Sequence, residues 1–81
     1  MGRAGKALKK VLEAHNISQN RLAVTMGVGR SNVHRWVYEV TDPVAEAVIE
    51  IRNALHQIEP SAADEFIKLY LGEATEHEAQ S

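Results

Sequence analysis

Apolar residues recur at helical spacing in five separate stretches of this 81-residue chain. In the first stretch Leu8, Val11 and Leu12 form one stripe with lysines beside it, which predicts a helix over roughly residues 3–15. The same spacing predicts further helices near 18–26, 30–38, 43–58 and 61–71. No stretch alternates between apolar and polar residues as a half-buried strand does, so we expect an all-α fold.

Residues that begin or end helices separate these stretches. Ser18 is a favoured N-cap, and Gly27 is expected to end the second helix in a left-handed conformation. Asp42 followed by Pro43 is typical of a helix start. Gly72 is expected to close the last helix.

A chain of this length can bury one modest core, so residues 1–72 are expected to form a single compact domain. Residues 73–81 are polar without an apolar repeat, which predicts a mobile tail. The helix over 61–71 is apolar around most of its circumference, so one side of it is expected to contact a second copy in a homodimer. The alternative is that this helix packs entirely into the core of its own chain. The predicted dimer residues are Phe66, Ile67, Tyr70 and Leu71.

Charge is distributed unevenly along the chain, although the net charge is only −2. Residues 1–40 carry seven Lys and Arg against two acids, a net of +5. Residues 41–81 carry two against nine, a net of −7. A basic half joined to an acidic half is typical of a protein with one face for a polyanion, and such a split also arises by chance in short chains.

The segment QNRLAVTMGVGRSNVHRWVY, residues 19–38, fits two helices joined by a three-residue turn. Ala23 is small where the second helix must cross closely, and Gly27 suits the backbone of the turn. Val33 and Trp36 are spaced to hold the second helix against a core.

This segment resembles the helix-turn-helix of the lambda-repressor and Cro family, also called the Xre family. The match runs through ISQNRLAVTMGVGRSNVHRW without a gap, and the resemblance covers roughly residues 5–58. It implies a compact five-helix, lambda-repressor-like DNA-binding domain with its helix-turn-helix at 18–38 and its recognition helix at 30–38 in the major groove. The implied function is a small sequence-specific regulator of transcription, of the repressor type, with double-stranded DNA as its partner.

Arginine suits a bidentate contact with guanine, and asparagine suits adenine. The resemblance assigns base reading first to Arg30, Ser31 and Arg35, with Asn32 and His34 as second choices. The candidate phosphate contacts are Gln19, by resemblance, and the basic residues Arg3, Lys6, Lys10 and Arg21. Each of these basic residues is equally consistent with an ordinary solvent-exposed side chain that contacts no phosphate. Tyr38 fits either a phosphate contact or packing against the helix over 43–58, and we favour packing.

Other function classes find little support in the sequence. The chain has no cysteine, and it lacks the motifs of zinc proteases, EF-hands and phosphate-binding glycine loops. We therefore expect no enzyme activity, metal or cofactor. We also expect no small-molecule effector. Without a signal-peptide core or long apolar run, a soluble cytoplasmic protein with no membrane partner is expected. One alternative stays open, which is a helix-turn-helix adaptor or an antitoxin-like module that binds another protein.

Overall fold

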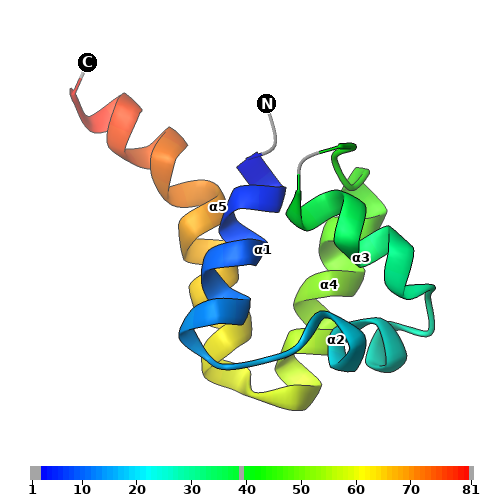
Figure 1. The fold of residues 1–81 in the computed structure, drawn as a ribbon. Coiled ribbons are helices and arrows are strands. Elements are labelled where there is room, and N and C mark those ends of the chain that lie inside the picture. Colours follow the sequence, from blue (N-terminus) through cyan, green and yellow to red (C-terminus); the bar gives the residue numbers. More distant parts are fainter. Residues whose placement is uncertain (1–2, 39, 81) are drawn as a thin grey trace.

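The structure, a computed structural model, describes the backbone of residues 3–38 and 40–80 and the side chains of residues 3–38 and 40–72. These residues form five α-helices and no strand, which confirms the all-α prediction. The helices are α1 (Arg3–Ala14), α2 (Gln19–Met26), α3 (Arg30–Val37), α4 (Ala45–Ile58) and α5 (Pro60–Gln80). In Figure 1, α1 and α5 lie side by side, and α2 and α3 lie across α1 from α5.

The ends of α2 follow the sequence prediction. The Ser18 hydroxyl accepts a hydrogen bond from the backbone N–H of Arg21 at 3.0 Å, so it caps the helix. Gly27 ends the helix with φ at 76°, in the left-handed region, and its N–H donates to the Ala23 carbonyl at 2.9 Å. Both ends are fixed by local chemistry that the sequence displays.

The start of α4 differs from the prediction. The helix begins at Ala45 rather than at Pro43, and its N-cap is Val44, which offers no side-chain hydrogen bond. Val44 has an extended backbone, with φ at −71° and ψ at 167°. Extended geometry suits a β-branched side chain, so the first helical turn forms two residues after the proline.

The end of α5 differs from the prediction. The helix begins at Pro60, one residue before the predicted range of 61–71. The Ser61 hydroxyl donates to Oε2 of Glu59 at 2.8 Å. The helix then continues through Gly72 to Gln80, so the prediction that Gly72 closes it is wrong. The mobility predicted for residues 73–81 stays a prediction, and residue 81 lies outside the described residues. A glycine inside a helix costs only about 1 kcal/mol relative to alanine, and the Glu, Ala and Gln residues after it favour helix.

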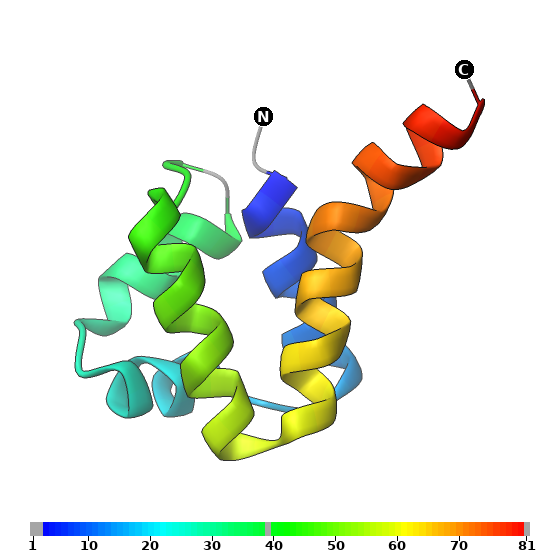
Figure 2. The same cartoon turned by 180° about the vertical axis from the view of Figure 1, so that it is seen from behind.

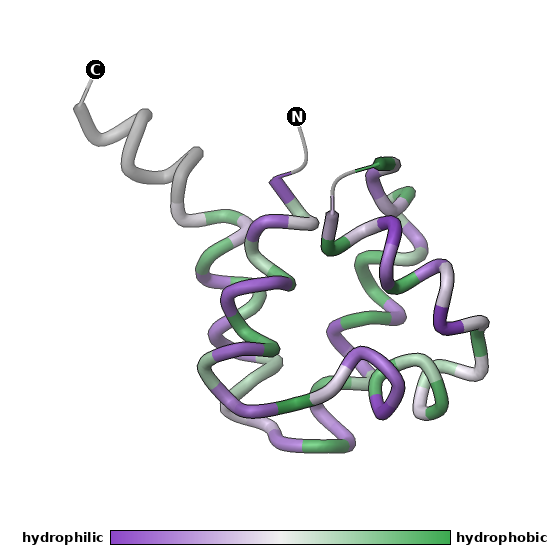
Figure 3. The backbone as a smooth tube through the Cα atoms, viewed as in Figure 1, coloured by the Kyte–Doolittle hydropathy of each residue, from purple (hydrophilic) through white to green (hydrophobic). Residues whose placement is uncertain are grey.

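A single apolar core joins the helices, and its members come from all five of them. Figure 3 shows hydrophobic and hydrophilic stretches alternating along α1 and α4, as expected for helices with one buried side. Trp36, predicted to be a core residue, is partly buried and packs against this core. The largest fully buried side chains are Leu8, Val11, Leu22, Val33, Ile51, Leu55 and Phe66.

Figures 1 and 2 agree that α1 lies between α3 on one side and α5 on the other. The outer surface of α1 therefore has two flanks. We call them the α3 flank and the α5 flank of α1, and each borders a different set of charged side chains.

Candidate nucleic-acid interface

The turn between α2 and α3 consists of Gly27, Val28 and Gly29. Gly29 caps α3 with an ordinary extended backbone, φ at −71°, and provides no side-chain hydrogen bond. Val33 and Val37 are the buried residues of α3, so one side of this eight-residue helix is anchored in the core. The opposite side faces solvent.

All five residues predicted to read bases are exposed on α3, namely Arg30, Ser31, Asn32, His34 and Arg35. Successive residues of a helix are about 100° apart, so residues four positions apart share a side. Ser31 and Arg35 therefore lie together at the centre of the side opposite Val33 and Val37. Arg30 and His34 form a second pair nearer one edge.

Tyr38 lies at the end of α3 and differs from its predicted role. Its side chain is 56% exposed, and its ring lies 4.4 Å from the His34 ring, centroid to centroid. The Lys9 ammonium lies 6.0 Å from the centre of the same ring. The packing against α4 that we favoured is therefore wrong. Tyr38 instead lies over the α3 flank of α1.

A groove of about 310 Å³ connects this point with the start of α2. Its lining combines polar and apolar residues, namely Lys9, Glu13, Asn16, Ser18, Gln19 and Tyr38 with Leu12, Ile17 and Val37. The first turn of any helix leaves backbone N–H groups without helical partners, and these groups together with the helix dipole favour an anion. Gln19, the predicted phosphate contact, is the first residue of α2 and lines this groove.

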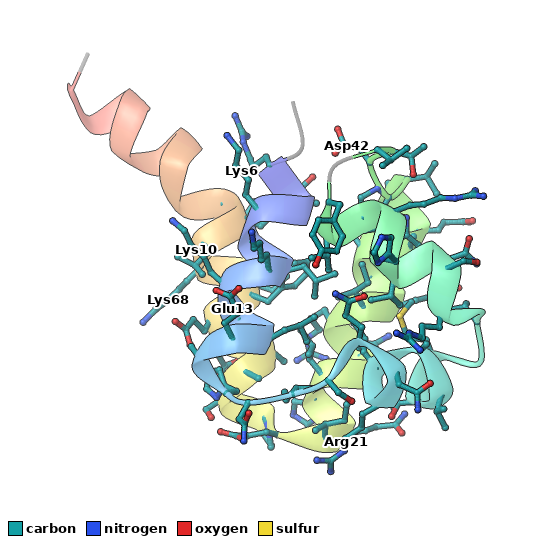
Figure 4. The ribbon with its side chains drawn as sticks, in the orientation of Figure 1. Lys6, Lys10, Glu13, Arg21, Asp42 and Lys68 are labelled. Carbon is teal, nitrogen blue, oxygen red and sulfur yellow. The ribbon has the colours of Figure 1, made fainter. Side chains whose placement is uncertain are left out.

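The other predicted phosphate contacts do not share this groove. Arg3, Lys6 and Lys10 border a different groove, on the α5 flank of α1, together with Lys68 (Figure 4). Arg21 is exposed near the end of the molecule where α1 joins α2 (Figure 4). The lysine beside α3 is Lys9, which the sequence analysis did not select.

Most of the residues predicted for dimerisation are buried or partly buried against the core of their own chain. Phe66 has no exposed surface, so its prediction as an intersubunit contact is wrong. Ile67 and Tyr70 are partly buried against the same core. Only Leu71 is exposed, at 51%. Of the four predicted residues, Leu71 therefore offers the most surface to a second copy, and the homodimer itself stays a prediction.

A second cluster of ionisable groups joins the end of α1 to α5. Nδ1 of His15 lies 2.9 Å from Oε2 of Glu59, and Nε2 lies 2.6 Å from Oε1 of Glu65. Both ring nitrogens donate to carboxylates only in the imidazolium form. The hydrogen bonds to Glu65 and Glu59, in that order, raise the pKa of His15. The Ser61 hydroxyl, and then His15, lower the pKa of Glu59. Sequence analysis missed this cluster.

Among the described side chains, no group of three or more His, Cys, Asp or Glu residues is arranged to hold a metal ion. No helix within the described part of the chain combines the length and apolar character that a membrane span requires. Comparison of the chain with models of protein families, with curated proteins and with solved structures found no match.

Proposed function

We propose that the protein binds double-stranded DNA in a sequence-dependent manner, as a small regulator of transcription, with α3 as the helix that enters the major groove. The observation that carries this proposal is the exposed side of α3. It holds five polar residues, two of them arginines, on a helix that Val33 and Val37 anchor in the core.

The side chains on α3 have the chemistry that base reading requires. Arginine can donate two hydrogen bonds to guanine O6 and N7, and asparagine can bond adenine in a bidentate manner. Ser31 and Arg35 lie at the centre of the exposed side and would face base edges when the helix lies in the groove. Asn32 and His34 flank them, and Arg30 lies one turn before His34, at the first position of the helix. Each good bidentate pair is worth about 1–3 kcal/mol of discrimination between bases.

The groove beside α3 provides the backbone contact that such a helix needs. The start of α2, the Lys9 ammonium and the exposed Tyr38 side chain all border it. Contacts of this kind fix the register of a protein on a duplex, whereas base contacts choose the sequence.

The local charge also supports binding to a polyanion. No Asp or Glu occurs from residue 14 to residue 38, a range that holds Arg21, Arg30 and Arg35. The nine acids of residues 41–81 belong to the other half of the chain. A duplex held against α3 would therefore meet Arg30 and Arg35, while Lys9 and Glu13 both border the adjacent groove.

The experiment begins by selecting a duplex from a random library and measuring its binding by fluorescence anisotropy, beside a scrambled duplex, at several salt concentrations. We expect Arg30→Ala or Arg35→Ala to weaken binding to the selected duplex about 10–100-fold, which corresponds to 1–3 kcal/mol. The scrambled duplex should be affected far less. Lys9→Ala should weaken both duplexes equally and reduce the salt slope by about 1.

The matched control is Arg52→Ala on α4, since the Arg52 guanidinium donates to its neighbour Asn53 at 3.1 Å and borders neither groove. It should bind the selected duplex as the parent does. Equal, weak binding of the parent to both duplexes would contradict the proposal and favour the protein-binding adaptor.

Light scattering on the DNA-free chain tests the two-fold dimer that would let two copies read adjacent half-sites.

A further inference from the structure

Four cationic side chains border one groove on the α5 flank of α1. Arg3, Lys6 and Lys10 come from α1, and Lys68 comes from α5. The groove has a volume of about 280 Å³, and Ala7 and Leu69 provide apolar surface inside it. Figure 4 shows Lys6, Lys10 and Lys68 on this flank, on the side of α1 that lies away from α3.

Stability of the fold does not account for this arrangement. Lys6 and Lys10 lie four residues apart on one helix, and like charges at that spacing destabilise a helix by a few tenths of a kcal/mol. Lys68 adds a third ammonium group from the facing helix. No ion pair is formed by these three lysines within the part of the chain that the structure describes. Asp64, one turn before Lys68, borders a neighbouring groove rather than this one.

We propose that this groove binds a compact oligophosphate, meaning a small molecule that carries two or three adjacent phosphate groups. Cations that line one hollow focus their field there and attract a concentrated negative charge. Lysine binds phosphate as a point charge on a flexible stem, so side chains from two helices can close on such a group.

The size of the groove is compatible with a small ligand. Sites for drug-sized molecules usually measure about 300–1,000 Å³, so 280 Å³ lies just below that range and suits a compact group. A chain of two or three phosphates places several charges within a space of this size. Duplex DNA spreads its charges along a broad surface, at one per 1.7 Å of helix axis.

A bound oligophosphate would connect α1 to α5, because the cations come from both helices. It would also relieve the repulsion between Lys6 and Lys10. Any ligand that binds only the folded state raises the unfolding temperature with its concentration. This inference does not depend on the proposed DNA contact, which lies on the α3 flank.

The test uses the full chain with tripolyphosphate as the probe and sodium sulfate at equal ionic strength as the reference. We expect the unfolding temperature to rise with tripolyphosphate well above the sulfate reference, and isothermal titration calorimetry to give one site per chain. Lys10→Gln combined with Lys68→Gln should reduce the affinity at least tenfold. Lys9→Gln removes the same charge from the other flank of α1, so it should leave the affinity unchanged.

Two further probes identify the source of the phosphates. A nucleoside triphosphate that binds more tightly than tripolyphosphate, with the same dependence on Lys10 and Lys68, supports a nucleotide ligand. No effect beyond sulfate, or an equal loss in Lys9→Gln, would overturn the proposal. Competition with a duplex is the last probe, measured on the double variant Arg30→Ala, Arg35→Ala. If the duplex displaces tripolyphosphate from this variant, the proposal is also overturned, because the groove then holds nucleic-acid backbone.

Discussion

The pair α2–α3 and the pair α4–α5 are built in different ways. Each helix of the first pair has eight residues and buries only two of them. In the second pair, α4 has 14 residues and α5 has 21, and Ile51, Leu55 and Phe66 are fully buried. The first pair therefore owes its shape largely to its caps and its turn, whereas the second owes its shape to packing. Changes in the turn of the first pair should alter stability through the backbone, and changes in the second pair should alter it more strongly, through packing.

The largest effect is expected from Phe66→Ala. Phe66 has no exposed surface, so its truncation should leave a cavity and lower the free energy of unfolding by about 3–5 kcal/mol. For a domain of this size, that is a large part of the total stability. Urea unfolding followed by circular dichroism measures the loss. Leu71→Ala on the same helix is the control, because Leu71 is 51% exposed and its change should stay within about 0.5 kcal/mol. Equal losses in the two variants would contradict the packing of α5.

A smaller effect is expected in the turn between α2 and α3. Gly27→Ala should cost about 1–2 kcal/mol, because φ at 76° is unfavourable for a residue with a Cβ atom. Nothing lies within 4 Å of the added Cβ, so the cost comes from the backbone alone. Gly27→Asn should recover part of the loss, since asparagine tolerates this conformation. Gly29→Ser should cost nothing, because φ there is −71° and serine is a favoured N-cap. A loss as large in Gly29→Ser as in Gly27→Ala would contradict this account.

The smallest effect concerns pH, since both carboxylates that contact His15 are more than 40% exposed. The pKa of His15 is raised above its ordinary 6.5, so its stabilisation is complete below pH 6.5 and is lost as the pH rises through the raised value. The pKa of Glu59 is lowered from 4.5, so its contribution is present above pH 4.5 and is lost as the pH falls through the lowered value. The cluster therefore stabilises the fold most between about pH 4.5 and 6.5.

Unfolding temperatures measured across this range test the cluster. His15→Gln should lower the unfolding temperature between about pH 4.5 and 6.5 and remove the decline above pH 6.5, so that the variant and parent curves converge at higher pH. His56→Gln is the matched control, because His56 is exposed on α4. A curve for His15→Gln that matches the parent curve at every pH would show that the cluster contributes nothing.

Features set by adjacent residues were predictable from the sequence. The five helices, the Ser18 cap and the end of α2 at Gly27 depend on periodicity and on local backbone chemistry. Gly72 shows the limit of the same rule. A glycine ends a helix only when the residues after it are more stable outside the helix, and the residues after Gly72 favour helix.

Features set by long-range packing were not predictable. Periodicity indicated which residues of α3 are exposed, because the buried valines define its inner side. It could not distinguish Lys9 from Lys10, since both lie off the apolar stripe of α1 and the difference depends on which helix borders each flank. His15 meets partners 44 and 50 residues later in the chain, and no local pattern signals such a contact.

The position of α1 between α3 and α5 has a consequence for synthesis on the ribosome. The apolar side of α1 is covered only after Phe66 and its neighbours have emerged, although α1 is made first. At 5–20 residues per second, the segment from the end of α3 to Phe66 takes roughly 1.5–6 s to translate. Until then, the nascent N-terminal half exposes the side of α1 that carries Leu8 and Val11. Thus α5, which follows α1 by some fifty residues, is the helix that lets α1 become part of a folded domain.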